Sequence, residues 1–78
     1  MNRIEKQVYF DKLTEVCEFV NLASRYDCDI KVRSSSHEVD GKSILGILAL
    51  ALWKPVTVSA CGTDAHEFAD KLTSFQPH

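Results

Sequence analysis

Ten consecutive residues, from Ile44 to Trp53, carry no polar side chain, and they lie near the middle of a chain of only 78 residues. Ser43 or Asp40 can cap a helix that starts here, and Pro55 ends it because the residue before proline is pushed out of the helical region. A helix that is apolar on every side is normally buried or partnered. A domain of this size cannot enclose all of it, so we expect one side to reach the surface.

The segment 11–26 has the period of an amphipathic helix. Asp11 or Thr14 is placed to cap its start, and we expect it to end near Tyr26. Its apolar residues recur at three-and-four spacing on one face, which predicts that this face is buried. The stripe consists of Leu13, Val16, Cys17, Val20 and Ala23 or Ser24, and it is widened by Phe19, Leu22 and Tyr26.

The segment after Gly62 predicts a last helix. Asp64 and Glu67 have the spacing of a capping box, with Thr63 as an alternative cap. An apolar stripe then runs along one face as far as Phe75. We expect this helix to pack against the same core as the helix at 11–26.

Alternation of apolar and polar residues predicts four strands, at 3–10, 30–33, 37–39 and 56–60. The resulting order is β-α-β-β-α-β-α within a single domain, residues 1–78. Three helices on one face of a four-stranded, mainly antiparallel sheet would bury both sets of apolar positions. The sequence therefore predicts an α+β fold, an open-faced β-sandwich.

Charge and composition argue against several classes of protein. The formal net charge is −2 and the basic residues are scattered, so we expect no nucleic-acid partner. The first ten residues include charges, unlike a signal peptide, and the apolar run is far below the roughly 20 residues of a membrane span. Cys17, Cys28 and Cys61 match neither a disulfide framework nor a zinc site. We expect a cytoplasmic protein without metal or cofactor.

Three stretches share their pattern with one known family: Ala23–Ile30, Gly41–Leu50 and Ala60–Ala65. They resemble HPr, the histidine-containing phosphocarrier of the bacterial phosphotransferase system. The first is similar to the end of the first HPr helix, the second to the region around its regulatory serine, and the third to the entry into its last helix. The resemblance implies the HPr fold and a place in the phosphotransferase system family.

The junction between the first strand and the first helix departs from that family. HPr carries its active histidine there, in a Gly-x-His-x-Arg-Pro segment, whereas residues 10–16 of this chain contain no histidine, arginine or proline. A phosphohistidine needs a nucleophilic ring nitrogen and nearby N–H groups and cations that hold the phosphate. We therefore predict that the chain keeps the fold without the phosphocarrier reaction and is not an enzyme.

Ser43 matches the position at which HPr of many Gram-positive bacteria is phosphorylated by a dedicated kinase. A phosphoserine at a helix N-terminus is favoured by the helix dipole. A plain N-cap serine explains the residue equally simply. The resemblance implies an HPr kinase as a partner and Ser43 as the candidate for regulatory phosphorylation.

The apolar segment Ile44–Trp53 is the candidate surface for a protein partner. In the family the second helix docks partner proteins, and exposed apolar surface of this kind marks interaction sites. We expect the partner-binding face to include residues from the set Ile44, Leu45, Ile47 and Leu48.

Two other functions remain open. The chain could be a phosphocarrier that uses an unorthodox acceptor, such as His37, His66 or a cysteine, although neither histidine has the flanking glycine or arginine. It could also be a structural domain that forms a homodimer through its apolar helix. The first hypothesis remains a regulatory, protein-binding module.

Overall fold

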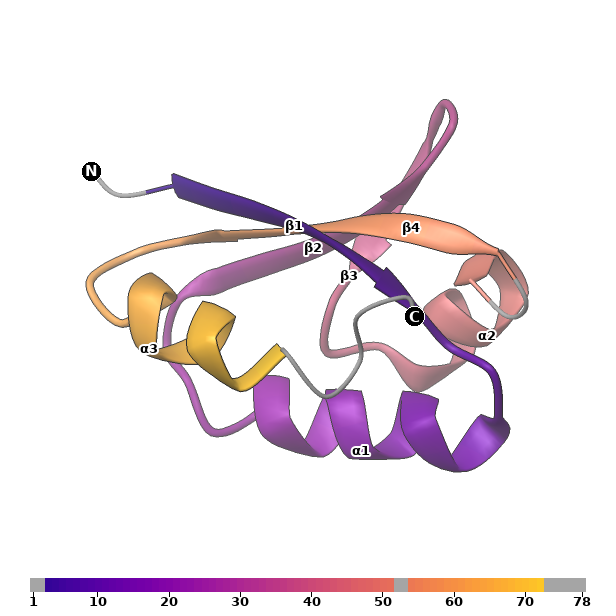
Figure 1. Ribbon diagram of the computed structural model, residues 1–78, viewed down its shortest axis with the longest axis horizontal. Helices are drawn as coiled ribbons and strands as arrows, with labels where there is room; N and C mark the ends of the chain where they lie inside the picture. Colours follow the sequence, from indigo (N-terminus) through magenta and orange to yellow (C-terminus); the bar gives the residue numbers. More distant parts are fainter. Residues whose placement is uncertain (1–2, 52–53, 73–78) are drawn as a thin grey trace.

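The three helices lie on one face of a four-stranded antiparallel sheet (Figure 1). This computed structural model describes residues 3–51 and 54–72, so Leu52, Trp53 and Phe75 of the predicted helices lie outside the described residues. The predicted fold class and element order are confirmed. The elements are β1 (Arg3–Tyr9), α1 (Leu13–Ala23), β2 (Asp29–Ser34), β3 (His37–Asp40), α2 (Ile44–Ala51), β4 (Pro55–Cys61) and α3 (Ala65–Lys71).

The strand order is β1-β4-β2-β3, which places the last strand of the sequence between the first two. Cross-strand partners share a face of the sheet, and the pairs Ile30–Ala60 and Val32–Val58 align buried residues toward the helices. The opposite face carries charged and polar side chains and is not covered by any described helix.

Aromatic side chains join the sheet to two helices. Phe10, just after β1, meets Phe19 of α1 edge-to-face, with ring centroids 5.3 Å apart. Phe19 in turn contacts Phe68 of α3 at 6.0 Å, and Phe68 contacts Tyr26 at 5.5 Å. The three phenylalanines are 0 % exposed. Such pairs each contribute about 0.5–1.5 kcal/mol beyond the area they bury, so this series fixes α1 against α3.

The ends of α1 differ from the prediction. Its N-cap is Lys12 rather than Asp11 or Thr14, and the carboxylate of Glu15 accepts the Asp11 N–H at 2.7 Å. The helix ends at Ala23 because the N–H groups that follow turn to the third residue back, as in the bond from Tyr26 N to the carbonyl of Ala23 at 3.2 Å. Leaving the helix early brings the Tyr26 ring onto Phe68.

The predicted capping box of α3 is wrong. Asp64 is the N-cap residue, but its side chain does not cap the helix. Instead, its Oδ2 atom accepts the N–H of Asp27 at 3.0 Å, across 37 residues of sequence. The carboxylate therefore ties the β4–α3 turn to the loop between α1 and β2.

We predict that Gly41 tolerates no larger side chain. A Cβ atom there would lie 2.3 Å from Cγ2 of the buried Ile30 and 3.0 Å from its carbonyl oxygen. Because neither atom can move away freely, Gly41→Ala should lower the free energy of unfolding by about 2–3 kcal/mol, measured by urea denaturation.

Gly46→Ala is the matched control. A Cβ atom at Gly46 would meet Val39 at 3.2 Å, a milder contact, and alanine favours a helix over glycine by about 1 kcal/mol. The two terms oppose each other, so stability should change little. Equal losses in both variants would contradict the steric argument.

Candidate functional site

The turn between β3 and α2 is fixed by several hydrogen bonds. Oδ1 of Asp40 accepts the N–H of Lys42 at 2.9 Å, and the Asp40 carbonyl accepts the N–H of Ser43 at 3.1 Å. The N–H of Gly41 donates to the carbonyl of Ile30 at 2.8 Å. These hydrogen bonds therefore hold the turn against β2 and fix the position of Ser43 at the start of α2.

Ser43 caps α2, as one of the two predicted alternatives stated. Its hydroxyl accepts the N–H of Gly46 at 3.3 Å, and its carbonyl accepts the N–H of Ile47 at 3.1 Å. The side chain is half-buried, so the hydroxyl lies at the surface end of the helix dipole. An anionic group attached there would face unpaired N–H groups of the first turn.

The apolar residues of α2 divide into a buried and an exposed set. Leu45 is 81 % exposed and Ile44 40 %, and the half-buried Leu48 packs at the edge of the core. Ile47 is 0 % exposed and belongs to the core with Leu50. Of the four residues in the predicted set, Ile47 therefore lies in the core, because its position three residues before Leu50 points it toward the sheet.

The start of α1 follows a junction, residues 10–16, that contains no histidine, arginine or proline. Lys12 is the N-cap, and the carboxylate of Glu15 already binds the backbone N–H of Asp11. The next residue, Leu13, is 55 % exposed, although the helical period had placed it on the buried stripe. The prediction that Leu13 belongs to the buried face of this helix is therefore wrong.

The structure does not bring the two described histidines together. His37 begins β3 and His66 lies in the first turn of α3, and both are exposed. No glycine or arginine adjoins either of them in the sequence. Neither residue lies in the turn that holds Ser43.

A second polar cluster, which the sequence did not indicate, surrounds Asp64. Burial, followed by the neighbouring carboxylate of Asp64, raises the pKa of the Cys28 thiol to about 11, so this thiol stays protonated at neutral pH. Burial by itself would raise the pKa of Asp64. The Asp27 N–H and the nearby Cys28 thiol outweigh it, and the pKa of Asp64 lies below its ordinary value.

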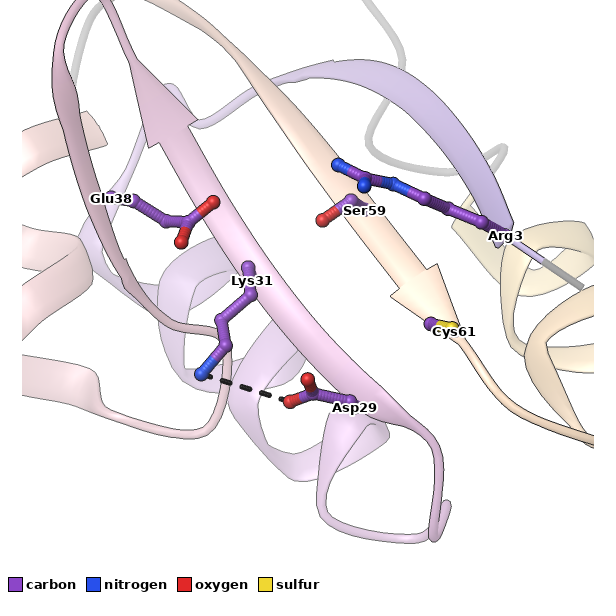
Figure 2. Close-up of a pocket in the computed structure, with 6 residues that line it drawn as sticks. All are labelled: Arg3, Asp29, Lys31, Glu38, Ser59 and Cys61. Atoms are coloured by element: carbon purple, nitrogen blue, oxygen red, sulfur yellow. Dashed lines mark ion pairs between the residues drawn. The ribbon is translucent and has the colours of Figure 1, made fainter. Parts of the chain in front are cut away.

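The uncovered face of the sheet holds a shallow pocket of about 270 Å³ (Figure 2). Positive and negative side chains both line it, and the ammonium of Lys31 lies 3.7 Å from the carboxylate of Asp29. None of the predicted site residues belongs to it. The lining residues are Arg3, Asp29, Lys31, Glu38, Ser59 and Cys61.

Comparison with known proteins now assigns the family. The family model described as the PTS HPr component phosphorylation site matches residues 15–76, most of the chain. The chain belongs to the HPr family. The match begins at residue 15, within the junction at residues 10–16 that contains no histidine, arginine or proline. The predicted resemblance is thereby confirmed.

Solved structures of HPr-family proteins agree with this assignment. The phosphocarrier protein HPr from Bacillus anthracis superposes with a TM-score of 0.78 at 25 % identity, covering 99 % of this chain and 100 % of that one. Crh, the Bacillus subtilis catabolite repression protein, has a TM-score of 0.71 at 28 % identity, covering 88 % and 80 % of the two chains, and its structure is described as a swapped dimer. An HPr dimer from Thermoanaerobacter tengcongensis has 33 % identity and a TM-score of 0.68, covering 76 % of this chain and 70 % of that one.

The α2 helix of this HPr-family chain has 8 residues. Among the described residues, no helix combines the length and apolar character that a span requires. The apolar character of α2 is therefore divided between the core and the surface beside Ser43.

We predict that Asp64 gives this HPr-family fold a stability that depends on acidity. Because the pKa of Asp64 is lower in the folded state than the ordinary 3.8, its contribution is present at neutral pH. It is lost as the pH falls below 3.8 and through the lower folded value. In urea denaturation between pH 7 and pH 2, Asp64→Asn should have a lower midpoint than the wild type at pH 7, and the difference should shrink with acidification.

Glu18→Gln, which alters an exposed carboxylate on α1, is the control for a general loss of negative charge. A constant difference between wild type and Asp64→Asn at all pH values would contradict the linkage.

Proposed function

We propose that this HPr-family chain is a non-catalytic regulatory protein of the cytoplasm. It binds a protein partner through the face formed by Ile44, Leu45 and Leu48, and phosphorylation of Ser43 controls that binding. The observation that carries the proposal is the 81 % exposure of Leu45, a large apolar side chain two residues after Ser43. Leaving such a side chain in water has a cost that binding removes.

The start of α1 supports a role without phosphotransfer. Phosphohistidine chemistry needs an imidazole nucleophile and free donors for the phosphate. Lys12 has no nucleophilic ring nitrogen, and the Glu15 carboxylate takes the Asp11 N–H and adds negative charge where a phosphate would have to approach. Both features act against a phosphoryl group at this end of the helix.

The start of α2 supports regulation at Ser43. A phosphoryl group there would add about −1.5 to −2 charges beside the N-terminal end of the helix dipole. The same charge would stand next to the exposed Ile44 and Leu45. A partner that covers these residues would have to desolvate the phosphate or pair it, so phosphorylation should change its affinity strongly.

Similarity to Crh fits the regulatory proposal, because Crh is a catabolite repression protein. The dimeric relatives leave self-association as the competing use of the same face. Light scattering over a concentration series separates the two, since a homodimer through α2 should dissociate when Leu45 becomes polar.

We predict that Leu45→Ser weakens partner binding at least tenfold. An apolar anchor at the centre of an interface commonly contributes about 2 kcal/mol or more. A partner captured with the wild-type chain should be purified and its dissociation constant measured by titration calorimetry. Leu13→Ser is the matched control, because it removes an exposed leucine from α1.

The control should change the affinity less than threefold. Unchanged binding by Leu45→Ser would contradict the proposed face, and circular dichroism should confirm that both variants remain folded.

We also predict a single phosphorylation, on Ser43. Incubation with ATP and an HPr kinase should add one phosphoryl group to the wild type and none to Ser43→Ala, measured by intact mass. Incubation with phosphoenolpyruvate and enzyme I should add none. Stoichiometric acid-labile phosphate in the second reaction would instead establish an unorthodox phosphocarrier, and His37→Ala and His66→Ala would then locate the acceptor.

A further inference from the structure

The turn that carries Ser43 is attached to a distant segment by one long side chain. The ammonium of Lys42 donates to the carbonyl of Tyr26 at 2.8 Å, across 16 residues of sequence. Lys42 forms no ion pair with a carboxylate among residues 3–51 and 54–72. Among the described residues, the side chain of Lys42 therefore forms its hydrogen bond with the backbone that follows α1, while its own N–H binds Asp40.

That backbone is a favourable place for a cation. The last turn of α1 contains no basic residue, so nothing in the helix itself balances the negative end of its dipole. Tyr26 extends this end, because its N–H still donates to the carbonyl of Ala23. Lys42 thus adds, from another segment, a positive charge at this end besides that of Arg25, which directly precedes Tyr26.

The Tyr26 end of this contact is rigid. The Tyr26 ring is only 8 % exposed and packs on Phe68, and the next residue, Asp27, donates its N–H to the Asp64 carboxylate. A bond to such a fixed carbonyl restrains the other partner. The restrained partner is the turn from Asp40 to Ser43.

Two contacts consequently hold the backbone just before Ser43. Gly41 packs its backbone on Ile30, and Lys42 reaches to Tyr26. The Gly41 contact belongs to the core and cannot be altered without strain. The Lys42 contact lies at the surface, so its charge can be removed while the core stays intact.

We infer that Lys42 is a positioning residue for Ser43: its ammonium holds the turn against the end of α1 and thereby fixes the serine hydroxyl and the first N–H groups of α2. This inference rests on the proposed role of Ser43 as a phosphorylation site. It adds that the position of the Ser43 hydroxyl depends on the hydrogen bond between the Lys42 ammonium and the Tyr26 carbonyl. Removing the ammonium should loosen the start of α2. The proposed partner-binding face, formed by Ile44, Leu45 and Leu48, should keep its side chains.

The experiment compares Lys42→Met, which keeps most of the stem, with Lys42→Arg, which keeps a cation. Lys54→Met is the matched control, because Lys54 is an exposed lysine close to the other end of α2 and has no hydrogen bond or ion pair within the described part of the chain. The first measurement is hydrogen exchange of the Gly46 and Ile47 amides, whose N–H groups bind Ser43.

In Lys42→Met, the hydrogen-exchange rates of these two amides should rise about tenfold, because one charge-assisted hydrogen bond is lost. The exchange rates of the β4 amides should not change. Lys42→Arg and Lys54→Met should resemble the wild type. Unchanged exchange at Gly46 and Ile47 in Lys42→Met would overturn the inference.

The second measurement is the kinetics of Ser43 phosphorylation by an HPr kinase. Lys42→Met should lower kcat at least fivefold with a smaller change in KM, because the serine is misplaced while the partner-binding face is intact. Lys42→Arg should restore kcat. A raised KM with unchanged exchange would mean that the kinase recognises the lysine charge directly, and the positioning role would be wrong. If the wild type accepts no phosphate, the proposed function fails, while the exchange measurement still decides the role of Lys42.

Discussion

The packing of Phe19 and Phe68 between two helices and the sheet is the interaction on which the rest of the molecule depends. Phe10 brings the end of β1 into this contact, and Tyr26 brings in the loop that leads to β2. A chain of 78 residues with no disulfide among its described cysteines has only this one core. The helices and turns that carry the surface residues all pack against this core.

The loop after α1 is where the core and the candidate site meet. Tyr26 contributes its ring to the aromatic series and its carbonyl to Lys42, while the neighbouring Asp27 contributes its N–H to Asp64. Few side chains therefore connect the start of α3 with the turn that carries Ser43. At the start of α1, the Glu15 carboxylate binds the Asp11 N–H in the same way, through a local contact between a side chain and the backbone.

The sequence predicted the fold well because its signals were local and strong. Alternating strands and amphipathic helices leave few ways to bury both sets of apolar residues, and Ser43 was one of only two available caps for the apolar helix. Helix ends were predicted less well. Period alone placed Leu13 on the buried face and Tyr26 at the end of a helix, whereas packing against Phe68 takes Tyr26 out of it.

By itself, the sequence determined the element order, the antiparallel sheet covered by three helices, the two candidate caps Ser43 and Asp40, and the absence of histidine from the junction after Phe10. Those properties follow from local periodicity and from residue identity. Only the tertiary structure decided that Ile47 is core while Leu45 is surface, that Asp64 binds Asp27 instead of capping its own helix, and that Lys42 reaches Tyr26. In a helix that is apolar on every side, no local pattern shows which side chains face the core. Likewise, no local pattern predicts a hydrogen bond to a partner 16 or 37 residues away, because the fold decides which segments lie side by side.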